Sequence, residues 1–238
     1  MLVLGFSFST LGRAQGPSLQ SYAGQTLILR YFGGQKAVSF RKDDFEKHKG
    51  ECDVAVEVKR VSFSHEKLKL KLETVGDLAV RGRAVKCTEL SQDIALNISG
   101  FAGGETEESV TRFVQQFLQT PDAYLATYGV KPVIPDPEGD STAIGLPRTG
   151  VTKPEVLLNV FPFYRRGLRI SYVQGIVTAT FEVGTDGRIH SPRIKNSPDR
   201  KLSEAVLRVL PLLRFQPARQ GGKPIRVRLG FEASFRVQ

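Results

Sequence analysis

The end of the chain, residues 175–238, constrains the fold most. In Gly175–Val183, apolar residues alternate with polar ones, a period of two that is typical of a half-buried strand. The apolar positions are Val177, Ala179, Phe181 and Val183. Asp186-Gly187 follows, and this pair favours a tight hairpin because both residues tolerate a positive φ. We therefore expect a β-hairpin that returns through Ile189–Ile194.

A helix and a long final strand are expected after this hairpin. Ser197-Pro198 is typical of an N-cap followed by the first helical position. The next apolar residues recur at the spacing of one helical face, and Pro211 ends the pattern. They are Leu202, Ala205, Val206, Val209 and Leu210. A turn at Gly221-Gly222 leads to residues 225–235, where apolar and polar residues again alternate. The predicted unit is hairpin, helix, strand.

Three motifs in this unit resemble the C-terminal domain of the TonB family of energy transducers. They are the hairpin with Thr-Asp-Gly-Arg-Ile at 185–189, Arg-Phe-Gln-Pro-Ala at 214–218, and Gly-Lys-Pro-Ile at 222–225. The resemblance covers about Pro154–Val237. Leu213 stands where the family usually has Trp, and residues 161–166 echo the family's Tyr-Pro-x-x-Ala segment only loosely.

The resemblance implies a binding module. The family's domain holds an extended segment of an outer-membrane transporter as an added strand, which requires an exposed sheet edge. We expect that edge in the last strand, and its candidate residues are Arg226, Val227, Arg228, Leu229, Gly230 and Phe231. The two arginines either lean over an acidic guest or protect the edge from aggregation. Gly230 either allows another backbone to approach or marks a bulge.

The positive charge of the chain lies in this C-terminal part. Residues 151–238 contain 16 Lys and Arg against 6 Asp and Glu, a net charge of +10, whereas residues 1–150 contain 18 of each. This excess is either a solvated face or a surface for an acidic segment, peptidoglycan or anionic lipid headgroups. Binding of peptidoglycan or of anionic lipid gives an alternative function, a structural or adaptor protein that binds envelope surfaces through this basic domain. No nucleic-acid recognition motif occurs, so no nucleic-acid partner is predicted. The oligomeric state is left open.

The first part of the chain predicts an antiparallel β-meander. From Cys52 to Ile98 apolar residues alternate with charged ones, and short turns are expected at Ser64–Lys67 and Gly76-Asp77. The lysines at 67, 69 and 71 are interpreted as part of the solvent-exposed face of the sheet, and a binding surface is the alternative. Thr106 is expected to cap one helix that covers the other face.

These patterns predict an α+β chain with four segments. They are a signal peptide (1–14), an antiparallel β domain with a C-terminal helix (15–130), a Pro-rich linker (131–153) and a TonB-like domain (154–238). The signal peptide is inferred from an apolar start that ends in Gly12-Arg13-Ala14 and is too short to span a bilayer. We therefore expect an exported, periplasmic or cell-envelope protein in which no inner-membrane anchor is evident.

The two cysteines, Cys52 and Cys87, fit a disulfide in an exported chain, and two free buried thiols are the alternative. We find no catalytic motif, no phosphate-binding loop and no metal-ligand spacing among the three histidines. The sequence therefore predicts a protein that is not an enzyme and has no catalytic residues, cofactor or metal.

Overall fold

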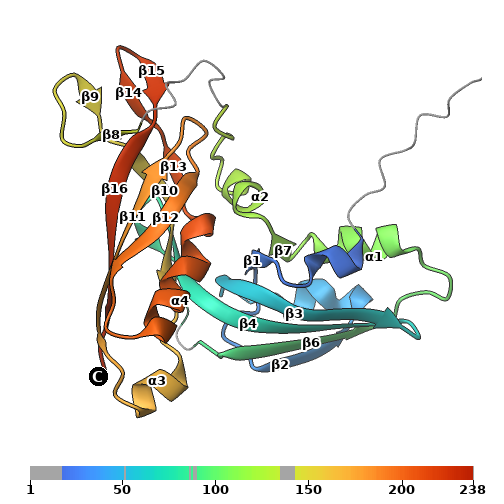
Figure 1. Ribbon diagram of the computed structural model, residues 1–238. Helices are drawn as coiled ribbons and strands as arrows, with labels where there is room; N and C mark the ends of the chain where they lie inside the picture. Colours follow the sequence, from blue (N-terminus) through green and yellow to red (C-terminus); the bar gives the residue numbers. More distant parts are fainter. Residues whose placement is uncertain (1–17, 51, 86, 88–89, 135–142, 238) are drawn as a thin grey trace, which may run out of the picture.

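The computed structural model describes residues 18–50, 52–85, 87, 90–134 and 143–237. The protein is α+β, with two groups of strands that run in clearly different directions (Figure 1). The predicted signal peptide, residues 1–14, lies outside the described residues.

The N-terminal half, residues 18–130, is built on a curved sheet. Its strands are β1 (Thr26–Leu29), β2 (Ala37–Arg41), β3 (Val54–Ser64), β4 (Lys67–Val80), β5 (Arg83–Ala84), β6 (Asp93–Ser99) and β7 (Leu118–Gln119). Its helices are the 3-10 helices η1 (Leu19–Tyr22) and η2 (Lys42–His48) and the α-helices α1 (Glu107–Val114) and α2 (Pro121–Ala126).

Two features of this sheet correct the predicted meander. β2 pairs with β6 in parallel, and β6 lies beside β4, so the strand order is not sequential. A parallel neighbour needs a long connection, and here that connection runs through η2, β3 and β4. The turn expected at Gly76-Asp77 is also absent, because β4 continues through both residues as one strand of 14. Thr106 does cap α1 as predicted, since its side chain accepts a hydrogen bond from the Ser109 amide.

The C-terminal unit, residues 154–237, contains the predicted hairpin, helix and strand. Its strands are β10 (Glu155–Pro162), β11 (Gly175–Val183), β12 (Ile189–Asn196), β13 (Arg214–Gln216), β14 (Ala218–Gln220), β15 (Lys223–Ile225) and β16 (Val227–Phe235). Its helices are α3 (Arg166–Ile170), α4 (Arg200–Val209) and the 3-10 helix η3 (Leu210–Leu212). The N-cap of α4 is Asp199 rather than Ser197, because the Asp199 carboxylate accepts from the Lys201 amide.

Strand pairing joins the two halves. The second part of β4 pairs with β10 from Gly76↔Pro162 to Val80↔Leu158, while its first part pairs with β6. The sheet therefore continues from the N-terminal half into the C-terminal unit. One hydrophobic core also draws on both, since it combines Ile28, Leu78 and Tyr124 with residues of β10, β11 and α4. The second core lies within the N-terminal half.

The predicted linker is partly structured. Two short strands lie in it, β8 (Ile144–Gly145) and β9 (Val151–Thr152). β8 pairs with β16 and β9 pairs with β14, so the described residues of this segment are held against the C-terminal unit by backbone pairing and do not form a free tether. Where the domains begin and end stays a prediction.

Gly76 lies where β4 passes from one half to the other. A Cβ at this position would be 2.5 Å from the carbonyl oxygen of Phe161 and 2.6 Å from Cγ1 of Val160. Both atoms belong to β10, so the absence of a side chain at Gly76 allows the two strands to pair.

An ion-pair network fixes α4 against the sheet at the same junction. The Arg208 guanidinium donates to both carboxylate oxygens of Glu73, at 3.3 and 3.2 Å, and also to Glu57. Arg165 and Lys59 complete the network around Glu73. Burial alone would raise the pKa of Glu73, but the hydrogen bonds from Arg208 and Lys59 outweigh it and hold this pKa below its usual range. The carboxylate is therefore charged when it contacts α4 at neutral pH.

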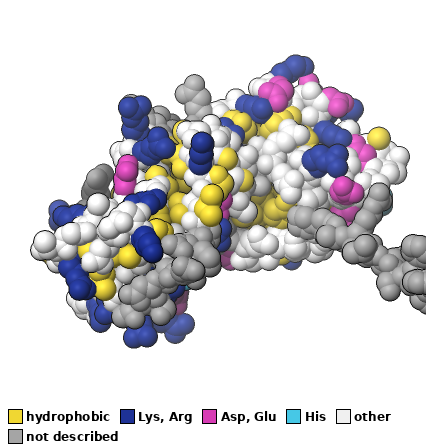
Figure 2. Space-filling view, turned by 90° about the horizontal axis from the view of Figure 1, so that it is seen from above, with side chains coloured by type: hydrophobic (Ala, Val, Ile, Leu, Met, Phe, Trp, Pro, Cys, Tyr) yellow, Lys and Arg dark blue, Asp and Glu magenta, His cyan; other side chains and the backbone are white. Residues whose placement is uncertain are grey.

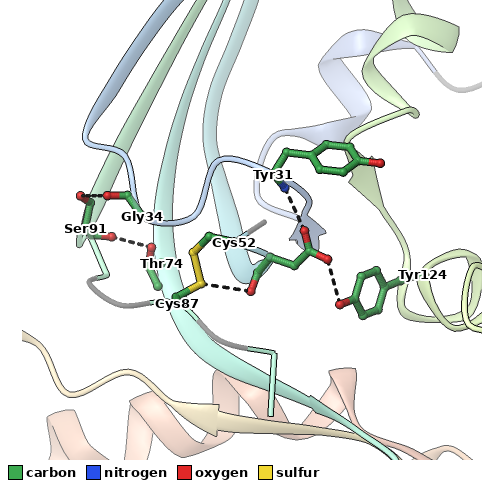
Figure 3. Close-up of a disulfide and its surroundings, with 8 residues drawn as sticks. Tyr31, Gly34, Cys52, Thr74, Cys87, Ser91 and Tyr124 are labelled. Atoms are coloured by element: carbon green, nitrogen blue, oxygen red, sulfur yellow. Dashed lines mark hydrogen bonds between the residues drawn. A yellow bond between two sulfur atoms is a disulfide. The ribbon is translucent and has the colours of Figure 1, made fainter. Parts of the chain in front are cut away.

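A disulfide joins Cys52, at the start of the strand region, to Cys87, with the two Cα atoms 5.0 Å apart. This separation lies within the range that a disulfide requires. Asp53 follows Cys52, and its buried carboxylate accepts from the Tyr31 amide at 2.9 Å and the Tyr124 hydroxyl at 3.1 Å (Figure 3). The bridge and this carboxylate together hold the loop after β1, the start of β3 and α2 at one place.

Replacing both cysteines by serine should lower the free energy of unfolding by roughly 4 kcal/mol in the chain-entropy description of a loop of this length. Urea unfolding of the full chain with and without dithiothreitol measures the effect. Reductant should destabilise the wild type but leave the double variant unchanged. An equal response of both proteins would contradict a role for the disulfide.

Arg208→Leu should leave Glu57 and Glu73 partly buried without their main partner and cost about 2–3 kcal/mol at pH 7. Because the folded-state pKa of each carboxyl is lowered, the stability that Arg208 provides is present above the unfolded pKa and lost as pH falls through the folded pKa. The gap between wild type and variant should thus close below about pH 4.

Chemical unfolding across this pH range tests the Arg208 prediction. Arg200→Leu is the matched control, because Arg200 forms an exposed pair with Glu204 on the same helix and should change stability little. A gap for Arg208→Leu that stays constant with pH would contradict the electrostatic role.

Gly76→Ala should destabilise the fold by about 2 kcal/mol or more, because its Cβ would collide with the β10 backbone. Gly167→Ala is the control, since Gly167 lies in α3 with no atom within 4 Å of the added Cβ. That change should be neutral or slightly stabilising, because alanine favours a helix. Thermal unfolding of both variants measures the difference, and equal melting temperatures would contradict the close packing at Gly76.

Candidate functional site

The final strand, β16, is the centre of the candidate site. It pairs with β11 along its whole length, from Val227↔Val183 to Phe235↔Gly175, with no register shift. Its other side faces away from β11. The apolar residues of β16 point toward the core, and Val227, Ala233 and Phe235 are buried there. The residues between the apolar positions, Arg228, Gly230, Glu232 and Ser234, are exposed.

A short strand covers the beginning of this outer side. β8 pairs in parallel with Val227 and Arg228, and the Ile144 amide donates to the Arg226 carbonyl at 3.2 Å. The prediction placed the open edge at Arg226–Phe231, and this pairing corrects it. Within the part of the chain that the structure describes, the open edge runs from Leu229 to Phe235.

The pairing also determines which backbone groups point outward. In an antiparallel pair, alternate residues exchange hydrogen bonds with the partner strand, and the residues between them turn their N–H and C=O to the other side. Since the Arg226 carbonyl already bonds on the outer side and the register is continuous, the even-numbered residues face outward. The free donors and acceptors of the edge are therefore those of Gly230, Glu232 and Ser234.

An apolar groove runs along this open edge. It has a volume of 530 Å³ and lies between β16 and β10, with Phe181 and Phe215 also in its wall. Val156 and Phe161 of β10 remain 38% and 49% exposed, and Leu229 and Phe231 of β16 are only partly buried. An extended chain beside β16 would place every second side chain into this groove.

The prediction did not include β10. The sequence does indicate this strand, because apolar residues lie on both faces of Glu155–Pro162. A strand of that composition packs against other parts of the protein on each face. One face of β10 packs in the shared core and the other lines the groove. That the second face meets the edge of β16 could not be read from the sequence.

Arg226 and Arg228 both form ion pairs with Glu182 of β11, at 3.5 and 3.2 Å. Their charges are therefore neutralised in part by their own sheet. Contact with an acidic guest and protection of the edge both stay predictions. Gly230 is not a bulge, because the register is continuous there, and no described atom lies within 4 Å of the Cβ that it lacks.

Phe215 of the Arg-Phe motif lines the groove and is held in place by its neighbours. Arg214 donates to the Asp122 carboxylate of α2 at 2.7 Å and to the carbonyls of Pro211 and Leu213 at 2.9 Å each. This fixes Phe215, whose carbonyl oxygen would be 2.1 Å from a Cβ on Gly187 (φ 72°). The hairpin motif and the Arg-Phe motif are thus in direct contact.

The family comparison agrees with this geometry. Residues 162–237, which comprise β16 and both of these motifs, match the family described as Gram-negative bacterial TonB protein C-terminal. This segment is a TonB C-terminal domain. The match confirms the resemblance seen in the sequence. It covers 76 of the 238 residues and begins at the last residue of β10.

The TonB C-terminal domain indicates a TonB-like envelope protein in energy-coupled transport, because domains of this family are non-enzymatic couplers that interact with outer-membrane proteins. A comparison with curated proteins found no match. Within the described residues, no helix has both the length and the apolar character needed to cross a membrane.

On the face of the molecule that is seen from above, the charge distribution follows the sequence. Seen from above, Lys and Arg side chains predominate over the C-terminal end, whereas acidic side chains are mixed with them over the N-terminal half (Figure 2). Any acidic partner segment would therefore be attracted to the TonB domain before contact.

Proposed function

We propose that the TonB domain binds an extended segment of an outer-membrane or other envelope protein, as an added strand along Leu229–Phe235 of β16. The observation that carries this proposal is the open outer edge of β16 beside an apolar groove. The backbone of the guest would pair with Gly230, Glu232 and Ser234. Its alternate side chains would enter the groove and contact Val156 and Phe161.

The open edge and the groove contribute differently to binding. Main-chain pairing gives affinity for any extended segment, and the groove selects apolar residues at every second position. The groove is limited on one side by β10, which is held in place by β4. The N-terminal half thus contributes indirectly to the site, since it positions the strand that the guest would contact.

The end of the edge that β8 covers sets the direction in which binding can extend. Val227 and Arg228 are occupied by β8, so an added strand would begin beside Leu229 and continue toward the end of β16. About seven residues of β16 are free for pairing, which corresponds to about 24 Å of extended chain.

Glu232→Pro tests strand addition directly. Proline at this position removes an outward-pointing N–H and leaves the ladder with β11 intact, as proline on an edge strand requires. The probe is an extended peptide selected from a display library on the wild-type full chain. In isothermal titration, the Glu232→Pro variant should bind this peptide about tenfold more weakly than the wild type, the loss expected for a ladder hydrogen bond and its neighbours.

Glu232→Ala is the matched control, because it removes the same carboxylate but keeps the N–H, and it should bind the peptide nearly as well as the wild type. Amide exchange of β11 in each variant verifies that the sheet is preserved. Equal affinity of the proline and alanine variants would overturn strand addition at this edge. A loss of all binding at high salt would also contradict it, since main-chain pairing is not screened as surface charge is.

A further inference from the structure

The outer face of the N-terminal sheet presents an ordered array of cations. Helices and loops cover the inner face, and no described element lies over β2, β6 and the first part of β4 on the outside (Figure 1). The register places the outward residues in three cross-strand rows. Two full rows are Arg60–Lys71–Ala95–Ala37 and Ser62–Lys69–Asn97–Ser39. The third consists of two pairs, Ser64–Lys67 and Ser99–Arg41, just beyond the last pair of β4 and β6, Leu68↔Ile98. We call these three rows the basic face.

The basic face carries five positive charges and no acidic residue. Its cations are Arg41, Arg60, Lys67, Lys69 and Lys71, all with exposed side chains. Among the described residues none of the five forms an ion pair, although most acidic groups nearby are paired. In the next row toward the TonB domain, Glu57 and Glu73 are neutralised by Arg208 and Lys59. Asp93, opposite Glu73 in that row, is exposed and forms no ion pair among the described residues, so one acidic side chain stands beside five cations. The field of these five cations is therefore not cancelled within its own surface.

Apart from Ala37 and Ala95, the neutral side chains of the basic face are small hydrogen-bonding groups. Three strands form a hollow of 430 Å³ on this face. Its outward side chains are Ser39, Arg41, Lys67, Lys69, Asn97 and Ser99. Hydroxyl, amide and ammonium groups together are the donors that phosphate oxygens accept from.

The shape and composition of the face favour a membrane over a protein. A specific protein interface needs an apolar or aromatic centre, and every exposed large hydrophobic side chain of the described residues lies outside these strands. The cations instead share one face of the sheet. The lysines lie about 7 Å apart along β4, Arg60 lies about 5 Å from Lys71 on the neighbouring strand, and Arg41 lies two strands away from β4. Cations spread over one face of a sheet can contact several headgroups at once.

We propose that the basic face binds the phosphate headgroups of an anionic lipid membrane. The contact is electrostatic and needs no insertion, because the face offers cations and small polar groups but no apolar anchor. It would orient the N-terminal sheet parallel to the bilayer and leave the groove beside β16 free. This surface is distinct from the TonB domain, and the proposal does not rest on strand addition.

Co-sedimentation with phosphatidylcholine vesicles, with and without phosphatidylglycerol, tests the proposal on the full chain. The triple variant Lys67→Ser, Lys69→Ser, Lys71→Ser should bind the anionic vesicles about 100-fold more weakly than the wild type, equivalent to about 1 kcal/mol per lysine. Binding by the wild type should be weak without phosphatidylglycerol and should fall at about 1 M salt, where the screening length is about 3 Å.

The control is the triple variant Lys195→Ser, Lys201→Ser, Lys223→Ser, which removes the same charge from exposed positions on the TonB domain. It should retain most of the vesicle binding. An equal loss in both variants would show that net charge alone attracts the protein, and this would overturn the basic face as a site. Unchanged binding by the first variant would overturn it as well.

Two further probes decide the kind of partner. Inorganic phosphate should compete only at high concentration, because one ion contacts few of the five cations, and strong competition would identify a small-molecule phosphate site instead of a membrane surface. Duplex DNA that bound as tightly as the vesicles, and lost affinity in the first variant, would overturn the assignment to lipid. Circular dichroism of both triple variants verifies that the sheet is intact.

Discussion

Backbone pairing along β4 is the constraint on which the rest of the structure depends. This strand pairs with β3 along one side, and with β6 and then β10 along the other. A strand of 14 residues that changes partners must bend, and Gly76 provides the room at the bend. Because hydrogen bonds continue through the junction, β10 and β13 of the C-terminal unit belong to the same sheet as the N-terminal strands, whereas β11, β12 and β16 form a second sheet. Within the described residues, no free linker separates the two halves.

The candidate binding groove follows from that junction. β10 is held by β4 on one side and by β13 on the other, and its exposed residues Val156 and Phe161 face the open edge of β16. The network of Arg208 with Glu57 and Glu73 fixes α4 at the same place. A groove whose two walls come from different sheets keeps its width only if both sheets are anchored, and these contacts anchor them.

Charge is arranged differently on the two halves. In the TonB domain, Glu182 partly neutralises Arg226 and Arg228. Backbone pairing and apolar contacts would therefore contribute most to binding at the edge of β16. On the outer face of the N-terminal sheet the five cations have no such partners within the described residues. The half with no net charge by sequence thus presents a strongly basic surface, because folding moves its acids to the junction and to the helical side.

The sequence by itself determined the local elements of the TonB domain. Alternation in Gly175–Val183, the Asp186-Gly187 turn and the apolar helical face after Asp199 act between near neighbours, so they predicted the hairpin, the helix and the final strand closely. They also gave the resemblance of the last part of the chain to the TonB C-terminal domain, since the motifs at 185–189 and 214–218 are local patterns. Only the tertiary structure decided that β8 covers Val227 and Arg228, that β10 forms the groove and that three rows of outward residues meet in one basic face. Each of these depends on the register between strands far apart in the chain, and a period of two along one strand carries no information about which strand lies beside it.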